Sequence, residues 1–318
     1  MKIIITGSAG FIGYHLCKSL LMDNYEIHGI DSINDYYDQN LKYKRLENLK
    51  SFDNFKFSKI DISNYESLNK IYHSYDPQKV VNLAAQAGVR YSLINPQAYL
   101  SSNLIGFFNI IELSRKYKVD GLIYASSSSV YGGNKKIPFS IDDTINNPIS
   151  LYAATKSSNE LIAKSYSYLH ELHTTGLRYF TVYGPWGRPD MAMYKFVDKI
   201  FSNTEISVYN NGNMKRDFTY IDDIILGTRA AIEKNYKCEI FNLGNNKIEK
   251  LMDMISLIEK SIGKKAKINF LPMQKGDVKE TFADINKSIK MLNYKPTTNI
   301  DKGINQFINW YLNYKQNS

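Results

Sequence analysis

A glycine-rich segment near the N-terminus places the strongest constraint on the fold of this chain. The run Gly7-Ser8-Ala9-Gly10-Phe11-Ile12-Gly13 follows an apolar, β-rich run and opens a helical pattern. Three glycines at these positions allow a tight turn, close approach of the backbone to a pyrophosphate, and close packing of helix on strand. The amides of the first helical turn then face the phosphate charge. This context predicts a dinucleotide-binding site.

The second predicted strand ends in Asp31, a carboxylate that selects the dinucleotide. At this position a carboxylate accepts hydrogen bonds from the adenosine ribose and repels a 2′-phosphate. The next residues, from Ser32 to Asp35, include no Arg that could hold such a phosphate. The sequence therefore predicts NAD and not NADP.

Short β-rich runs alternate with helical patterns in the first half of the chain, which is typical of βαβ units around a parallel sheet. The predicted strands are 2–6, 26–31, 55–60, 79–84, 121–126 and 174–179, and the predicted helices are 11–22, 41–50, 65–75, 96–117 and 151–170. After about residue 180 we expect short elements between turn-rich segments, with 239–243 returning to the sheet edge and 300–314 forming a closing amphipathic helix.

We therefore expect an α/β fold in two interleaved parts. Residues 1–180 would form a Rossmann-type, doubly wound parallel sheet that binds NAD, joined by a returning segment near 217–262. Residues 181–318 would mainly form a smaller, mixed α/β substrate-binding region.

Composition excludes several functional classes. The 318 residues carry a net charge of +9, but the basic residues are dispersed and their clusters are short, so we expect no nucleic-acid partner. No apolar run approaches the roughly 18–20 residues of a membrane helix. Cys17 and Cys238 are too few for a disulfide framework or a four-ligand zinc site, and the five histidines show no metal spacing. We expect a cytoplasmic protein without a metal.

A serine row and a Tyr–Lys pair suggest hydride-transfer chemistry. Tyr152 and Lys156 share one face of a predicted helix, and Ser126-Ser127-Ser128-Ser129 lies at the carboxyl end of the fifth predicted strand. Ligands of open α/β sheets bind at the carboxyl ends of strands. A serine there can bond a sugar oxygen while Tyr152 exchanges its proton. The charges of Lys156 and of the nicotinamide would lower the phenol pKa from about 10.

Together these motifs resemble the NAD-dependent epimerase/dehydratase family, a branch of the extended short-chain dehydrogenases/reductases. The resemblance spans essentially the whole chain, and two segments look most like bacterial UDP-glucuronate 4-epimerases: Gln86-Ala87-Gly88-Val89-Arg90-Tyr91-Ser92 and Trp186-Gly187-Arg188-Pro189-Asp190-Met191-Ala192. It implies that Tyr152 takes the 4-hydroxyl proton, that tightly bound NAD takes and returns the C4 hydride, that Lys156 lowers the Tyr pKa and bonds the nicotinamide ribose, and that Ser127 holds O4.

The resemblance also implies ligand contacts by position. The cofactor residues would be Gly7, Gly10, Phe11, Ile12, Gly13, Asp31, Asn34, Asp61, Ile62, Leu83, Ala84, Ala85, Gln86, Asn103, Ala125, Tyr152, Lys156 and Tyr179. The substrate residues would be Gln86, Arg90, Ser127, Ser128, Thr181, Arg188, Lys195, Tyr209, Arg216 and Asp277. Among these, Arg216 would bind the diphosphate and Tyr209 would lie near the uracil and ribose. We expect Tyr36, Tyr37 and Tyr43 to be loop and packing residues.

Two serines separate the possible reactions. Related 4,6-dehydratases carry Asp-Glu, and related decarboxylases Ser-Glu, where this chain has Ser128 and Ser129. A hydroxyl cannot replace a carboxylate in that acid–base chemistry near pH 7. The sequence therefore favours 4-epimerisation of UDP-glucuronate to UDP-galacturonate, which would supply surface polysaccharide. Serine-row hydroxyls with Arg188 would hold the uronate carboxylate, although Arg188 could instead fix its loop by pairing with Asp190, and Arg90 could serve in its place.

Three alternatives stay open at this point. The chain could epimerise neutral or N-acetylated UDP-hexoses, it could be a decarboxylase or dehydratase, or it could be a non-catalytic NAD-binding sensor. The family resemblance further implies a homodimer, in which the helices near 96–117 and 151–170 form a four-helix bundle.

Overall fold

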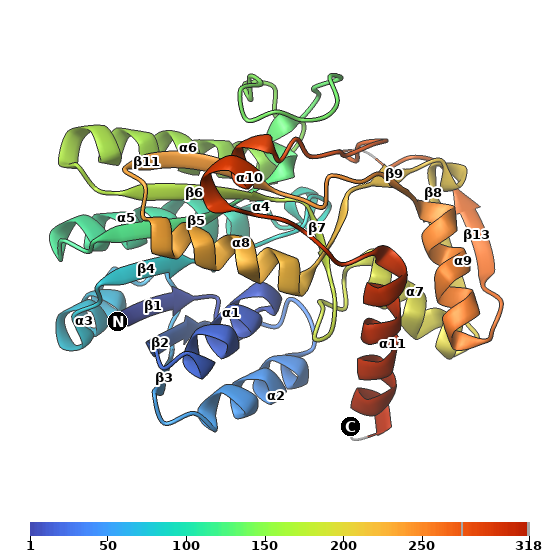
Figure 1. The fold of residues 1–318 in the computed structure, drawn as a ribbon, viewed down its shortest axis with the longest axis horizontal. Coiled ribbons are helices and arrows are strands. Elements are labelled where there is room, and N and C mark those ends of the chain that lie inside the picture. Colours follow the sequence, from blue (N-terminus) through green and yellow to red (C-terminus); the bar gives the residue numbers. More distant parts are fainter. Residues whose placement is uncertain (275, 317–318) are drawn as a thin grey trace.

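A computed structural model describes residues 1–274 and 276–316, while Lys275, Asn317 and Ser318 lie outside the described residues. At its centre lies a parallel sheet of seven strands, flanked by helices (Figure 1). The strands are β1 (Lys2–Thr6), β2 (Glu26–Asp31), β3 (Phe55–Lys59), β4 (Lys79–Asn82), β5 (Gly121–Ser127), β6 (Thr174–Tyr179) and β11 (Cys238–Leu243). Their spatial order is β11-β6-β5-β4-β1-β2-β3, so the direction of winding reverses between β1 and β4. Ligands of such sheets bind at this reversal.

Helices cover both faces of the sheet. On one face, α1 (Phe11–Met22) contacts both α2 (Gln39–Lys50) and α8 (Ile221–Lys234). On the other lie α3 (Tyr65–Tyr75), α5 (Gly106–Lys116) and α6 (Leu151–His170). Alternation along β1 divides the core accordingly, because Ile3 and Ile5 join one buried apolar cluster and Ile4 joins the other. The predicted doubly wound α/β sheet is confirmed.

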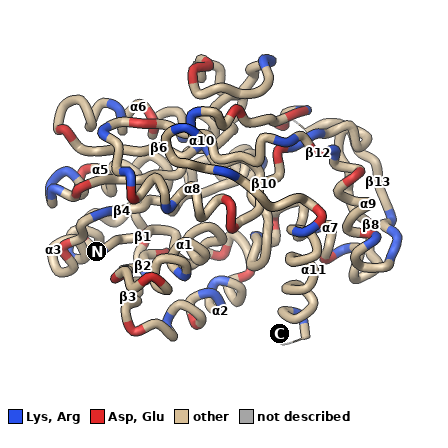
Figure 2. Tube along the Cα trace, viewed as in Figure 1, with Lys and Arg blue, Asp and Glu red and all other residues tan. Residues whose placement is uncertain are grey.

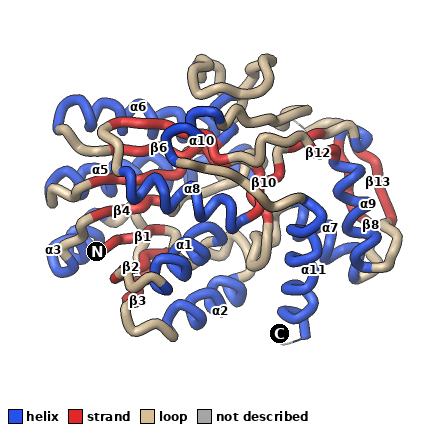
Figure 3. Tube along the Cα trace, in the orientation of Figure 1, coloured by secondary structure: helices blue, strands red, loops and turns tan. Residues whose placement is uncertain are grey.

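The second half of the chain forms smaller units beside the sheet. Its strands pair in twos: β7 (Thr181–Tyr183) with β10 (Phe218–Tyr220), β8 (Glu205–Tyr209) with β13 (Lys267–Leu271), and β9 (Lys215–Arg216) with β12 (Glu249–Lys250). Its helices other than α8 are α7 (Ala192–Phe201), α9 (Leu251–Ile262), α10 (Asn286–Leu292) and α11 (Ile300–Gln316). Figure 3 shows how these helices and strands intermix beside the central sheet.

Several predicted elements are confirmed, and two expectations are wrong. The predicted return of 239–243 to the sheet edge is confirmed as β11, and 300–314 falls within α11. The single helix expected over 96–117 is interrupted: α4 (Pro96–Tyr99) passes into a π-helical segment, Leu100–Ile105, before α5 begins. Asn103 lies in this wider turn and bonds the backbone of another segment, as described below.

The expectation of short elements after residue 180 also fails for α7, α8 and α9. In α9, for example, Leu251, Met254, Ile255 and Ile258 are buried, and their spacing follows one helix face. The periodic signal was present there but lay between turn-rich segments.

Charges of both signs occur throughout the described residues. Figure 2 shows Lys and Arg interspersed with Asp and Glu around the fold. Among the described residues, no helix combines the length and the hydropathy needed to cross a bilayer.

Candidate active site

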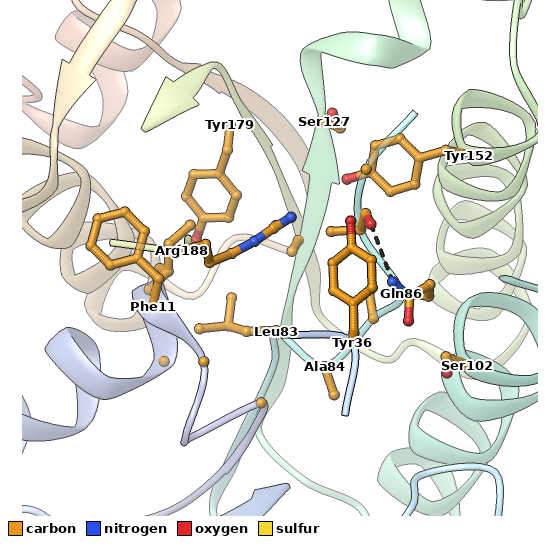
Figure 4. A pocket seen from close by; sticks show the side chains of 18 of the residues that line it. Phe11, Tyr36, Leu83, Ala84, Gln86, Ser102, Ser127, Tyr152, Tyr179 and Arg188 are labelled. Atoms are coloured by element: carbon orange, nitrogen blue, oxygen red, sulfur yellow. Dashed lines mark hydrogen bonds between the residues drawn. The ribbon is translucent and has the colours of Figure 1, made fainter. Parts of the chain in front are cut away.

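A cavity of about 360 Å³ opens where the carboxyl ends of β1, β2, β4, β5 and β6 converge (Figure 4). It is lined by every residue predicted for the cofactor except Asn103: Gly7, Gly10, Phe11, Ile12, Gly13, Asp31, Asn34, Asp61, Ile62, Leu83, Ala84, Ala85, Gln86, Ala125, Tyr152, Lys156 and Tyr179. The chain therefore brings segments from most of its first half to one hollow.

The glycine-rich loop forms the floor of this cavity at the start of α1. Gly7 has φ +72°, and a Cβ there would lie 2.7 Å from the Ala84 amide nitrogen at the end of β4. A Cβ on Gly13 would lie 2.0 Å from the Gly7 carbonyl oxygen. Only glycine fits either position, so the backbone itself is available to a bound phosphate.

Asp31 lies at the end of β2 and organises the rim beside that loop. Its two oxygens accept hydrogen bonds from the Ala9 amide (3.1 Å) and the Ile33 amide (2.9 Å). Burial raises the pKa of Asp31, while those bonds and the charges of Lys42 and Arg45 act in the opposite direction. Lys42 is a cavity cation that the sequence analysis missed, and its ammonium donates to Asn34 O (2.6 Å) and Oδ1 (2.7 Å).

Asn103 is not among the described residues that line the cavity, and its cofactor contact stays a prediction. Its side chain accepts from the Gln86 amide (2.8 Å) and donates to the Gln86 carbonyl (3.0 Å) and to Thr155 Oγ1 (3.1 Å). Asn103 is 1 % exposed. The π-helical turn thus lets it hold Gln86, which does line the cavity.

Ser127, Tyr152 and Lys156 meet on the opposite wall, as the sequence predicts. Figure 4 shows the Tyr152 hydroxyl turned into the cavity near Ser127. Lys156 is 2 % exposed, and its Nζ donates to Ala125 O at 2.8 Å. Burial lowers the pKa of Lys156 to about 8.

Burial raises the pKa of Tyr152, which is opposite to the lowering that we expected. The hydrogen bond with Ser127 and the charge of Arg188 act to lower it. Burial is the largest of these effects. The expectation also relied on the nicotinamide charge, which acts only in the complex.

A buried ion pair supports this wall from behind. Glu160, one turn after Lys156 on α6, accepts from Arg178 at 2.9 and 2.7 Å and from Ser126 Oγ at 2.5 Å. Because successive strand residues face opposite sides, fixing Ser126 on Glu160 directs Ser127 to the cavity. Sequence reasoning did not find this pair, since its members lie on different elements.

Five of the predicted substrate residues line the cavity: Gln86, Ser127, Ser128, Thr181 and Arg188. Arg188 belongs to residues 184–191, which we call the substrate loop. Its Nε lies 3.0 Å from Asp190 Oδ1, so the loop-fixing ion pair that the sequence left open is present. Arg188 nevertheless faces the cavity (Figure 4).

The remaining substrate candidates lie outside the residues that line this cavity. Arg216 and Arg90 share the carboxylate of Asp277, at 2.9 and 3.5 Å, and the Arg90 guanidinium lies 4.7 Å from the centre of the Tyr209 ring. Lys195 lies on α7 and is exposed as a whole residue. Partial desolvation of its ammonium lowers its pKa, the charges of Arg90 and Arg188 lower it further, and the charge of Asp190 raises it. These cations form one positively charged region next to the cavity.

The interpretation of Tyr36 and Tyr37 as loop and packing residues is wrong in part, because both line the cavity. The Tyr36 hydroxyl donates to Asp190 Oδ2 at 3.2 Å, and its ring lies 4.7 Å from that of Tyr91. The Tyr37 hydroxyl accepts from Arg45 at 2.8 Å. The sequence did contain a signal for this position, because a pair of aromatic residues closely follows Asp31, the carboxylate predicted to bind the ribose. Tyr43, by contrast, is 43 % exposed.

The similarity of this chain to known proteins agrees with the geometry of the site. The model of the NAD dependent epimerase/dehydratase family matches residues 3–244. An uncharacterized protein of Methanocaldococcus jannaschii is 55 % identical over 99 % of this chain and 97 % of its own length. A UDP-glucuronate 4-epimerase of Thermodesulfobacterium geofontis is 44 % identical over 96 % of this chain and 95 % of its own.

Among solved structures, the fold is similar to that of a UDP-glucuronic acid 4-epimerase from Bacillus cereus in complex with UDP-glucuronic acid and NAD. The TM-score is 0.94 at 37 % identity, covering 99 % of this chain and all of that one.

Proposed function

The chain belongs to the NAD dependent epimerase/dehydratase family, and on this premise we propose that it interconverts UDP-glucuronate and UDP-galacturonate by inverting C4 of the sugar. One observation carries the proposal. Ser127, Tyr152 and Lys156 converge on one wall of the cavity, and the two positions that follow Ser127 carry hydroxyls and not carboxylates. The site thus has the groups for oxidation and reduction at C4 and lacks those for elimination or decarboxylation.

The cavity fits NAD. The glycine-rich loop leaves no room for a Cβ at Gly7 or Gly13, so its amides can approach a diphosphate, and Asp31 offers a carboxylate to ribose hydroxyls. NAD bound there would supply the hydride acceptor and donor for the sugar C4. A Lys ammonium has three donors, and Lys156 directs one to Ala125 O, which leaves donors for the nicotinamide ribose.

Tyr152 moves the proton at O4. As phenolate it takes the proton when the 4-hydroxyl becomes a ketone, and it returns that proton on reduction. Ser127 holds O4 beside it. Because the two sugars differ at C4, the cavity must accept the ring in two orientations, with Tyr152 serving O4 in both.

The uronate carboxylate is held by the hydroxyls of Ser128 and Thr181 and by Arg188, all of which line the cavity. A 4-keto uronate is a β-keto acid that loses CO₂ readily, so a fixed carboxylate protects the intermediate. Arg presents a planar fork suited to a carboxylate. The relatives at 44 % and 37 % identity are UDP-glucuronate 4-epimerases, which supports this choice of sugar.

The UDP moiety binds in the positively charged region next to the cavity. We assign the diphosphate to Arg216, with help from Lys195 and Arg90, and the uracil and ribose to Tyr209. Asp277 orients both arginines. Residues 1–180 then form the NAD-binding part, and residues 181–318, apart from the returning segment near 217–262, form the substrate-binding part.

We also propose a homodimer built through α5 and α6. These adjacent helices, with the π-helical segment, leave apolar side chains exposed: Ile105 at 54 %, Phe108 at 48 %, Leu161 at 67 %, Tyr168 at 85 % and Leu169 at 64 %. A second copy would cover this face. Light scattering at micromolar concentration should give the mass of a dimer, and a monomer mass would contradict the proposal.

We propose a cytoplasmic location. Both cysteines are free thiols, Cys17 buried and Cys238 exposed, which suits a reducing compartment.

One experiment tests the reaction. Purified protein is mixed with UDP-glucuronate, without added cofactor, and the sugar anomeric protons are followed by NMR. We expect UDP-galacturonate, approaching the same ratio from either side. A UDP-pentose would indicate a decarboxylase and a 4-keto-6-deoxy sugar a dehydratase. Equal turnover of UDP-glucose would indicate a neutral-hexose epimerase, and no turnover of any UDP-sugar would leave an NAD-binding sensor.

A further inference from the structure

Arg45 on α2 is a fully buried charge with an unusual set of partners. It is 0 % exposed, and none of the described acidic residues forms an ion pair with it. Its Nη1 donates to Ala9 O and to Tyr37 Oη, both at 2.8 Å. Its Nη2 donates to Trp186 O at 2.5 Å and to Gly187 O at 3.4 Å. Burying a guanidinium is costly even with the charge of Asp31 nearby. The hydrogen bonds of this one go to three backbone carbonyls and to Tyr37, which suits a side chain that connects segments.

The backbone acceptors of Arg45 belong to two separate segments, and each segment contributes other residues to the cavity. Ala9 lies in the glycine-rich loop, and its amide donates to Asp31, the predicted ribose carboxylate. Trp186 and Gly187 belong to the substrate loop, which carries Arg188 and Met191 to the cavity. Arg45 is therefore a single side chain that joins the glycine-rich loop to the substrate loop.

The substrate loop depends on such an anchor. Trp186 has φ +61°, in the left-handed region that a bulky residue occupies only at a conformational cost. Its carbonyl is the acceptor at 2.5 Å from Arg45. Beside it, Pro185 O accepts from His15 Nε2 on α1 at 2.8 Å. Both anchors come from helices of the NAD-binding part.

We propose that Arg45 is a positioning residue that closes the substrate loop against the glycine-rich loop, and that it thereby slows the release of NAD and sets the wall that receives the sugar. The part that concerns the sugar rests on the proposed function. The guanidinium suits this task because two separate nitrogens of its rigid fork each bond one loop, Nη1 to Ala9 O and Nη2 to Trp186 O, whereas a lysine would have to reach both loops from one nitrogen.

The test compares Arg45→Met, which removes the donors, with Arg45→Lys, which keeps the charge. Lys50→Met is the matched control, because it removes an exposed cation from the same helix. The first measurement is the exchange of protein-bound NAD for isotope-labelled NAD, followed by mass spectrometry. The second is kcat and KM for UDP-glucuronate with NAD saturating, and circular dichroism verifies the fold of each variant.

In Arg45→Met we expect NAD exchange and the KM for UDP-glucuronate each to rise about tenfold or more, as for the loss of a charge-assisted hydrogen bond. We expect kcat to change less than about threefold, since Arg45 contacts neither Ser127, Tyr152 nor Lys156. For the rate of NAD exchange and for the KM, Arg45→Lys should lie between Arg45→Met and the parent protein, and Lys50→Met should match the parent protein. If Arg45→Met does not fold, Arg45→Lys decides, because a faster exchange is expected there too.

Folded Arg45 variants that exchange NAD at the parent rate and keep the parent KM would overturn the proposal, even if their melting temperature falls. If the parent protein does not convert UDP-glucuronate, the proposed function fails, while NAD exchange still decides the role of Arg45.

Discussion

Arg178 and Glu160 form a two-point ion pair behind the wall that carries the catalytic residues. The Nε–Oε1 and Nη2–Oε2 distances are 2.9 and 2.7 Å, and both side chains are 3 % exposed. Glu160 also accepts from Ser126 Oγ, and Arg178 donates to the Tyr131 hydroxyl at 3.0 Å. Strand β5, helix α6 and strand β6 are thereby tied together next to Ser127.

Glu160→Gln should destabilise the protein strongly. The change leaves Arg178 buried without its counter-ion, which costs roughly 3–5 kcal/mol in comparable pairs. Urea denaturation would measure the free energy of unfolding. Glu112→Gln is the control, since its pair with Arg115 lies at the surface and should matter little. Adding Arg178→Met to Glu160→Gln should recover part of the loss, whereas additive effects would show that the pair is not coupled.

Tyr152→Phe should abolish most of the turnover without removing NAD. The phenol is the proton acceptor in our proposal, and loss of a general acid–base group lowers kcat by roughly 10²–10⁴-fold. Stopped assays by NMR would measure the rate, and the absorbance of released NAD would measure occupancy. Tyr166→Phe, on the same helix but bonded to Glu112, should be fully active. If the Tyr152→Phe enzyme kept more than a tenth of the parent activity, the phenol would not be the proton acceptor.

Arg188→Met should discriminate against the uronate. A charge-assisted bond to the carboxylate predicts a rise of roughly 10–100-fold in the KM for UDP-glucuronate. The inhibition constant of UDP-glucose, which lacks the carboxylate, should barely change. Lys199→Met, which removes a cation of α7 bonded to Glu205 O, is the control. An equal loss for both sugars would show that Arg188 only fixes its loop through Asp190.

His15 should make stability depend on pH below neutrality. Burial lowers its pKa from 6.5 to about 4. Between those values the unfolded chain binds a proton that the folded protein does not, so the free energy of unfolding falls as the pH falls. From pH 6.5 to pH 4 this loss approaches about 3 kcal/mol.

His15→Gln keeps a donor for the Pro185 carbonyl and should reduce that loss. Urea denaturation at several pH values between 4.5 and 7 would measure it. An unchanged slope in His15→Gln would mean that the ring is charged in the folded protein.

Asp31→Asn should weaken NAD binding and relax its discrimination from NADP. The amide accepts fewer hydrogen bonds from ribose and no longer repels a 2′-phosphate, so we expect affinity for NAD to fall about tenfold. Titration of the NAD-free protein, followed by tryptophan fluorescence, would give both dissociation constants. Glu47→Gln, exposed on α2, is the control. If the affinity for NAD did not change, Asp31 would have only a structural role, through its bonds to the Ala9 and Ile33 amides.

Local patterns decided much of this protein. The turn over Gly7, Gly10 and Gly13 lies within one short segment, Asp31 ends a strand beside it, and Tyr152 and Lys156 are one helical turn apart. Such contacts depend on spacing along the chain, so the sequence was sufficient to predict the parallel sheet, the dinucleotide site and the catalytic pair.

Only the tertiary structure decided which distant side chains meet. Arg45 reaches Trp186, Tyr36 reaches Asp190, Arg178 reaches Glu160, and Arg216 shares Asp277 with Arg90. These partners come from separate elements. The periodicity of the sequence does not indicate which distant residue a polar side chain will contact. Buried charges are paired because desolvation makes an unpaired one costly, but which pairs form depends on how the sheet brings its loops together.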